Sequence, residues 1–363
     1  MYDGKTHTLF AKYAIPQMIG LLFNSIYLIV DGIFIGNRLG RDAMAAAVSV
    51  PFIEVLIALS MAAASGAGII ISSQLGQKEN EKAIQTFNTA ILCSASIGIA
   101  VIILGNIFLH PLAEILGSTP QIHHKAISYL WYIVTFSPFL LFSFLLGGLA
   151  RNDGCPKLAM FALSFGSVSN MVLDYLFMYP LNMGIAGAAL ATAIGPIFSA
   201  GILLPHFLMQ RGNLYFARLK IQLHNIRRIF ILGFPSFIME FTIGIVTFVY
   251  NYAIVKHGYG EIGLAAYLVI GYLMLIILTI FLGMAEGLQP VFSYFTGTGE
   301  ENRNRDMRHF ATKVFLIVGI FCYLLILLFS RYFFSIFNPG DAELIAFMTS
   351  KSIPYFCVFF GWI

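Results

Sequence analysis

Charged residues are scarce in this chain of 363 residues: Asp, Glu, Lys and Arg make up only 10% of it, and hydrophobic residues make up 59%. A soluble domain usually carries about 25% charged residues, because these keep its surface hydrated. The 21 basic and 17 acidic residues also gather in short clusters between long apolar runs. The shortage of charge therefore excludes a soluble protein and predicts an all-α polytopic membrane protein.

Motifs for enzyme chemistry are missing as well. The only Gly-Lys-Thr sequence, at Gly4–Thr6, lacks the earlier glycine and the preceding strand of a phosphate-binding loop, so no ATP-driven step is expected. There is no His-Glu-x-x-His or Gly-x-Ser-x-Gly motif, and the eight histidines and four cysteines form no cluster with metal-ligand spacing. We therefore expect neither an enzyme nor a bound metal or cofactor.

Long apolar runs are what the sequence does contain. The first is too long for the core of a signal peptide and lacks a small-residue cleavage site, so it is expected to remain as a membrane helix. With the N-terminus in the cytoplasm, the cytoplasmic segments hold fifteen Lys and Arg residues and the opposite face six. This favours a multi-pass protein of the cell membrane, with basic loops beside lipid rather than a nucleic-acid surface. The runs are 12–36, 43–73, 84–109, 127–149, 158–180, 185–208, 229–255, 262–292, 310–330 and a partial one from about 352.

The chain also resembles itself at an offset of 219 to 221 residues. AIP at 14–16 corresponds to GFP at 233–235, GRDAMAA at 40–46 to GEIGLAA at 260–266, and Gly76 to Gly297. Two copies of six helices would cross the membrane in the same direction, related by a pseudo-two-fold axis along the membrane normal. Two full copies need about 440 residues, so the second bundle is expected to be truncated after nine to ten helices in all. The expected parts are an N-terminal six-helix bundle (1–209), a cytoplasmic linker (210–228) and an incomplete C-terminal bundle (229–363).

Five acidic residues lie inside the apolar runs instead of in loops. An acidic residue at the centre of a membrane helix costs about 2.5–3.5 kcal/mol unless it is protonated, paired or in contact with water. None of the five has a Lys or Arg in the interior of its own span, since Lys12 stands at the very start of the first one, so we expect a proton or a mobile cation as partner rather than a fixed positive group. These residues are Asp31, Glu54, Asp174, Glu240 and Glu286.

Helical spacing groups other polar residues with two of these acids. Gln17, Asn24 and Asp31 recur every seven residues, so they lie on one face of the first helix. Asn170 and Asp174 are four residues apart and share a face of another helix. Carboxylate and amide oxygens suit a hard cation or a hydrogen-bonded proton. The sequence leaves open the alternative that these side chains only join helices to one another.

These patterns together resemble the multidrug and toxic compound extrusion (MATE) transporters. The likeness rests on Asp31 fifteen residues after Pro16, on the pair Asn170 and Asp174, and on the sequence GIAGAALAT that ends at Thr192. It covers essentially the whole chain and implies two six-helix bundles that face each other in a V around a central cavity. It further implies export of organic cations in exchange for protons or sodium ions, with Asp31, Asn170, Asp174 and Thr192 forming the cation site of the first bundle.

The second bundle fits the resemblance less well. Glu240 follows Pro235 by five residues, about one turn nearer to that proline than the glutamate of some family members. Glu54 and Glu286 belong to no motif, and each is either an acid that faces the cavity or a buried, protonated packing group. The candidate substrate-binding residues are Gln17, Asn24, Glu54, Glu240 and Glu286.

Two other functions remain open from the sequence. An exporter of lipid-linked sugars on a related bundle plan is expected to have basic residues in its cavity for a pyrophosphate, whereas the charges inside the spans here are all acidic. An intramembrane aspartyl protease needs two Asp side chains within hydrogen-bonding distance on two helices. The Gly-rich motif expected around its second Asp is missing here.

Overall fold

α-Helices form all the regular secondary structure in the described part of the chain. The structure is a computed structural model that describes residues 2, 4–40, 43–218, 223–257, 260–337, 345–346 and 348–350. The helices are α1 (Thr6–Leu39), α2 (Ala43–Ala47), α3 (Val50–Gly76), α4 (Asn80–Ile107), α5 (Leu109–Ile115), α6 (His123–Asn152), α7 (Pro156–Met178), α8 (Gly184–Leu208), α9 (Leu223–Lys256), α10 (Gly260–Thr298) and α11 (Glu301–Phe337).

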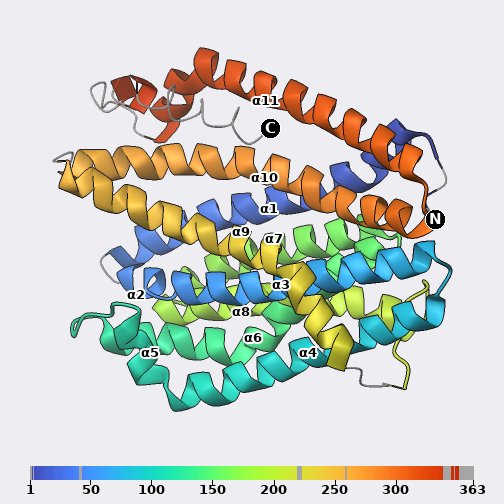
Figure 1. Cartoon of the computed structure of the whole chain (residues 1–363). Helices are drawn as coiled ribbons and strands as arrows, with labels where there is room; N and C mark the ends of the chain where they lie inside the picture. Colours follow the sequence, from blue (N-terminus) through green and yellow to red (C-terminus); the bar gives the residue numbers. More distant parts are fainter. Residues whose placement is uncertain are drawn as a thin grey trace.

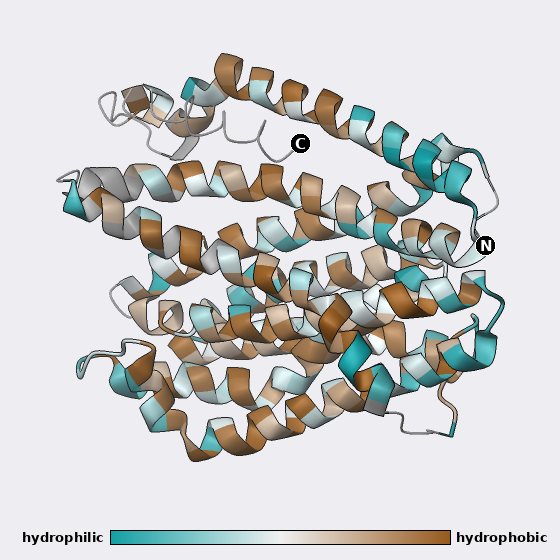
Figure 2. Ribbon diagram, viewed as in Figure 1, coloured by the Kyte–Doolittle hydropathy of each residue, from teal (hydrophilic) through white to brown (hydrophobic). Residues whose placement is uncertain are grey.

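The long helices run roughly side by side through the molecule, with α11 along one edge and α4 along the opposite edge (Figure 1). Among the described residues, eight helical segments are long and apolar enough to cross a membrane: α1, α2 together with α3, α4, α6, α7, α8, α10 and α11. Hydrophilic residues gather at the helix ends, especially at the end where α1, α4 and α11 begin (Figure 2). The chain is thus a multi-pass membrane protein.

Helices α1–α8, the N-terminal half, pack on one another through small residues. Helix α7 packs on α1 and α8, and α6 packs on α3, α4 and α8. Gly166 of α7 faces Gly195 of α8 so closely that a Cβ on Gly195 would lie 3.1 Å from the Gly166 carbonyl oxygen. Such close approach of backbones is common between membrane helices, where dispersion contacts replace the hydrophobic effect.

The C-terminal half, α9–α11, meets the N-terminal half at glycines. Gly66 of α3 faces Gly233 of α9, and Gly287 of α10 faces Tyr13 and Ala14 of α1. A Cβ on Gly287 would lie 2.6 Å from the Tyr13 carbonyl oxygen, so a side chain there would force the helices apart. The repeat offsets of 221 and 219 relate Gly66 to Gly287 and Ala14 to Gly233, so the two contacts involve corresponding positions.

Several helix boundaries differ from those expected. The run at 43–73 is divided between α2 and α3, because Pro51 occupies a first-turn position that favours a helix start. The run at 84–109 ends at Ile107, before the short helix α5. Helix α9 begins at Leu223, inside the expected linker, and α11 is much longer than the run at 310–330. The partial run from 352 lies outside the described residues.

The first part of the linker is fixed to the N-terminal half. Asp153, in the turn between α6 and α7, accepts a 2.7 Å hydrogen bond from the backbone N–H of Asn213 and lies 2.7 Å from Nε2 of His206. Asn88 of α4 hydrogen-bonds the backbone of Tyr215. Burial raises the pKa of the Asp153 carboxyl, and the hydrogen bonds from His206 and Asn213 oppose this rise. The part of the expected linker as far as 218 is therefore anchored to the N-terminal half.

Candidate functional site

A cavity of about 140 Å³ lies between the two halves. Helices α1, α3, α6, α7 and α8 form its wall on one side, and α9 and α10 form it on the other. Much of the remaining lining is apolar, including Leu21, Met61 and Phe144. All five residues proposed from the sequence to bind substrate line this cavity: Gln17, Asn24, Glu54, Glu240 and Glu286.

A guanidinium group that the sequence analysis missed also lines the cavity. Arg151 lies in the last turn of α6, two residues beyond the expected end of that span, and is only 8% exposed. Its Nη1 donates a 2.9 Å hydrogen bond to Oε1 of Gln17, whose Nε2 donates a 2.7 Å hydrogen bond to Oε2 of Glu286. Nη2 of Arg151 lies 3.6 Å from the same Glu286 oxygen.

This cluster corrects two expectations. Glu286 was expected to have no fixed positive partner, but Arg151 is one. Arg151 comes from a different helix, in the other half of the molecule. The charges inside the spans are also not all acidic, since Arg151 belongs to α6 and faces the same cavity as the acids. Arg151 lies 135 residues before Glu286 in the sequence, so the residues of the span that contains Glu286 give no sign of this partner.

The other two carboxyl groups of the cavity have no such partner. Within the described residues, no hydrogen bond or ion pair engages the carboxyl group of Glu54 or Glu240. Glu240 lies close enough to Glu54 and Glu286 for its carboxylate to be repelled by each of theirs. With three carboxyl groups and one guanidinium, the cavity favours positively charged occupants.

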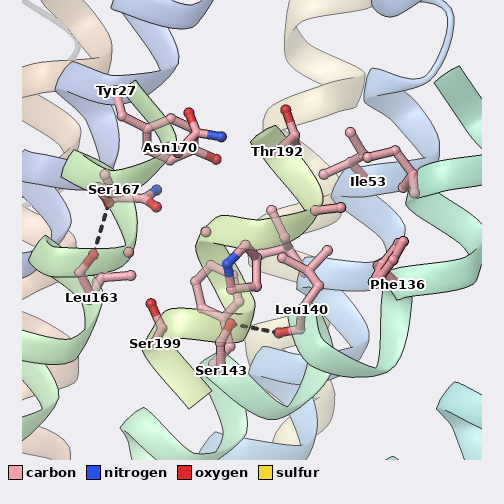
Figure 3. Close-up of a pocket in the computed structure, with 18 residues that line it drawn as sticks. Tyr27, Ile53, Phe136, Leu140, Ser143, Leu163, Ser167, Asn170, Thr192 and Ser199 are labelled. Carbon is pink, nitrogen blue, oxygen red and sulfur yellow. Dashed lines mark hydrogen bonds between the residues drawn. The ribbon is translucent and has the colours of Figure 1, made fainter. Parts of the chain in front are cut away.

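A second, smaller cavity of about 50 Å³ lies within the N-terminal half, between α1, α3, α6, α7 and α8. Asn24 lines both cavities, whereas Asn170 and Thr192 line only this one (Figure 3). The Thr192 hydroxyl donates a 3.0 Å hydrogen bond to the Ala188 carbonyl and lies 3.4 Å from the hydroxyl of Tyr129. The structure therefore brings α1, α7 and α8 together around polar side chains proposed from the sequence.

Two carboxyl groups lie beside each other next to this smaller cavity. Asp31 of α1 meets Asp174 of α7, which is fully buried and one turn beyond Asn170. Apart from each other, the carboxyl oxygens of Asp174 and Oδ1 of Asp31 have no hydrogen-bond partner in the part of the chain that the structure describes, and neither has Oδ1 of Asn170. Two adjacent carboxylates repel strongly where the dielectric constant is low, so the pair requires a proton or a bound cation.

Two tyrosines complete the surroundings of this pair, and the sequence analysis missed both. Tyr27 precedes Asp31 by one helical turn on α1, and Tyr129 belongs to α6. Both lie close enough to Asp31 and Asp174 to interact with them electrostatically. Tyr27 could have been predicted to lie near Asp31, because residues four positions apart share a face of a helix. The sequence of α6 contains no comparable pattern that would place Tyr129 near the two acids.

The polar face of α1 is divided between the two cavities. Gln17 faces the central cavity, Asn24 lines both cavities, and Asp31 faces α7. A straight helix rotates by about 20° per seven residues relative to an exact repeat, so about 40° separates Gln17 from Asp31. This rotation turns one polar stripe toward two different sites.

Comparison with known proteins identifies the family. The model of the family MatE matches residues 16–176 and 235–361. The multidrug export protein MepA of Staphylococcus saprophyticus is 26% identical over 353 residues, which cover 96% of this chain and 76% of the relative. MepA of Staphylococcus aureus strain MRSA252 is also 26% identical, over 335 residues that cover 91% of this chain and 73% of the relative.

Solved structures share the fold. A MATE in complex with MaD3S is 21% identical and superposes with a TM-score of 0.91, covering 97% of this chain and 79% of that one. The outward-facing conformation of a multidrug resistance MATE family transporter is 22% identical and superposes with a TM-score of 0.91, covering 97% of this chain and 79% of that one. A MOP superfamily transporter from Pyrococcus furiosus, reported with a binding pocket of reversed polarity, is 22% identical. It superposes with a TM-score of 0.87, covering 98% of this chain and 78% of that one.

The family match spans most of the chain and includes the helices that carry Asp31, Asn170 and Asp174. The MATE family consists of transporters rather than enzymes. This multi-pass membrane protein belongs to the MATE family.

Proposed function

We propose that this protein is a secondary active multidrug efflux antiporter of the cell membrane, with its N-terminus in the cytoplasm. It exports small organic cations in exchange for protons or sodium ions by alternating access. The observation that carries the proposal is the pair Asp31 and Asp174, which lies in the N-terminal half without any fixed positive partner among the described residues. The names of the MepA relatives support the export of drugs.

The site around Asp31 and Asp174 suits the coupling ion. Its unpaired oxygens come from two carboxyl groups and an amide, which are ligands for a hard monovalent cation and acceptors for a proton. The residues that supply these oxygens all belong to helices of one half, so the site needs no ligand from the other half. We assign the site to Asp31, Asn170, Asp174 and Thr192.

The central cavity suits the exported compound. Carboxyl groups attract a cation, and apolar neighbours such as Met61 and Phe144 contact its hydrocarbon part and adapt to different shapes. Its volume of about 140 Å³ is below the roughly 300–1,000 Å³ that drug-sized ligands occupy. The two halves must therefore separate on one side before a drug can enter, which supports alternating access.

The repeat supports a rocking movement of two related bundles. The contact of Gly66 with Gly233 and that of Gly287 with Ala14 lie at corresponding positions in the two copies. This is the relation expected of a pseudo-two-fold axis along the membrane normal. Helices α1, α3, α9 and α10 would form the surfaces that move.

The alternatives fit the sites less well. A pyrophosphate would face three carboxyl groups and a single guanidinium in the central cavity, which disfavours an exporter of lipid-linked sugars. The closeness of Asp31 and Asp174 does meet the geometric requirement of an aspartyl protease. Membership of a transporter family argues against that reading.

Transport in proteoliposomes tests the proposal. Ethidium is loaded inside, and its efflux is followed after a proton gradient or a sodium gradient is imposed. Wild-type protein should show efflux only with one of the gradients, and Asp31→Asn should abolish the dependence on it. Efflux by Asp31→Asn at the wild-type rate would remove the coupling role, and wild-type efflux without any gradient would remove the antiport mechanism.

A further inference from the structure

The guanidinium of Arg151 uses only part of its hydrogen-bonding capacity. Only its Nη1 makes a hydrogen bond, to Gln17, and its buried Nε has no partner within the described part of the chain. Nη2 is 3.6 Å from Glu286, beyond the roughly 2.7–2.9 Å of a charge-assisted hydrogen bond. A buried ion pair with such geometry recovers little of the free energy of dehydrating its charges. The pair is therefore poorly suited to act as a permanent structural bond.

The surroundings allow this guanidinium to leave. Arg151 lines the central cavity, and Gly147, one turn earlier on α6, lines it as well without a side chain. A Cβ on Gly148 would lie 3.7 Å from Nη2, so the guanidinium lies beside the bare backbone of this glycine and not beside a polar side chain that could hold it. The stem of Arg151 has several rotatable bonds, so the guanidinium can turn away from Glu286 within the cavity that it lines, while Gln17 stays bonded to Glu286.

We propose that Arg151 is a built-in cation that occupies Glu286 when the central cavity is empty, and that a cationic substrate must displace it. This inference rests on the proposed export of organic cations and adds how the substrate is admitted and released. Displacement weakens the net affinity for each cation, because the substrate competes with a tethered group of the same charge. Return of the guanidinium to Glu286 then favours release and opposes rebinding.

Equilibrium binding without any gradient tests the proposal. Ethidium and its uncharged ring parent, phenanthridine, are titrated calorimetrically into purified protein. Arg151→Gln should bind ethidium about tenfold more tightly than the wild type, with phenanthridine unchanged, because the competitor is gone. Arg151→Lys keeps the charge and should stay within about threefold of the wild type. Arg211→Gln, at an exposed residue outside the cavity, is the matched control.

The double variant decides whether Arg151 acts through Glu286. Glu286→Gln should weaken ethidium binding about tenfold, and adding Arg151→Gln to it should then produce no tightening. If Arg151→Gln weakens ethidium binding or leaves it unchanged, the proposal is overturned. Equal shifts for ethidium and phenanthridine would also overturn it, since they would show a bond that merely joins the two halves.

The outcome of the binding experiment can be distinguished from the outcome of the transport experiment that tests the proposed function. Failure of gradient-driven efflux would remove the antiporter, while tightening in Arg151→Gln would still show competition for a cation subsite. Conversely, coupled efflux by the wild type together with unchanged ethidium affinity in Arg151→Gln would keep the antiporter and remove the competition.

Discussion

The two carboxylate sites differ in what accompanies them. Asp31 and Asp174 lie together within the N-terminal half, and no basic side chain reaches them among the described residues. Glu286 lies at the boundary of the two halves and faces both Gln17 and Arg151 from the opposite half. The first site therefore needs an ion from solution, whereas the second carries a cation of its own. The difference suggests a division between a coupling site and a substrate site.

The largest effect is expected from Asp174→Asn. Removing this carboxyl abolishes the repulsion that demands a proton or cation, so the gradient no longer drives the cycle, and we expect the initial rate of ethidium efflux to fall at least about twentyfold. The control is Asp306→Asn, an exposed acid of α11 outside both cavities, which should transport normally. Equal rates for the two variants would break the proposed division.

A smaller and different effect is expected from Glu286→Gln. The substrate loses one charged contact while the coupling site remains, so the apparent KM for ethidium should rise about tenfold with little change in kcat. Asp174→Asn should instead act mainly on kcat. If the two variants changed the same kinetic constant in the same direction, the two sites would have to be treated as one.

Gly287→Ala tests the boundary itself. The new methyl group would meet the Tyr13 carbonyl oxygen at 2.6 Å, and overpacking of this kind costs about 1–3 kcal/mol. We expect a lower midpoint of thermal unfolding and about threefold slower efflux. Gly271→Ala is the matched control on the same helix, because nothing lies within 4 Å of its Cβ position. A change of similar size in the control would show that any alanine in α10 is harmful.

The smallest effect is expected from Tyr129→Phe. Its hydroxyl lies 3.4 Å from that of Thr192, a long contact at the edge of the coupling site. Removing it should change the concentration of coupling ion needed for half-maximal efflux by about twofold to threefold and leave the KM for ethidium unaltered. A change in KM instead would place Tyr129 with the substrate site.

The long apolar runs and the acids inside them could be predicted from the sequence, because both are local properties of composition and spacing. The pairing of Gln17 with Glu286 could not, since the two residues are 269 positions apart and meet only through the packing of α1 on α10. Arg151 was missed for a related reason: hydropathy ends that span at 149, but the helix continues to Asn152 and buries the guanidinium. The seven-residue spacing predicts a rotation of about 40° between Gln17 and Asp31, but it does not predict which helices the two ends of the stripe face.

The anchoring of the segment after α8 indicates where the two halves can be separated. This segment is bonded to Asp153 and Asn88 as far as Ala217, and Gln85 bonds the carbonyl of Arg218, so it is fixed to the N-terminal half although α8 ends at Leu208. A split version expressed as two fragments, or a chimera that exchanges bundles with a relative, should therefore be cut after Arg218. A cut directly after Leu208 would leave Asp153 with His206 alone and would separate Asn88 from the backbone of Tyr215 and Ala217.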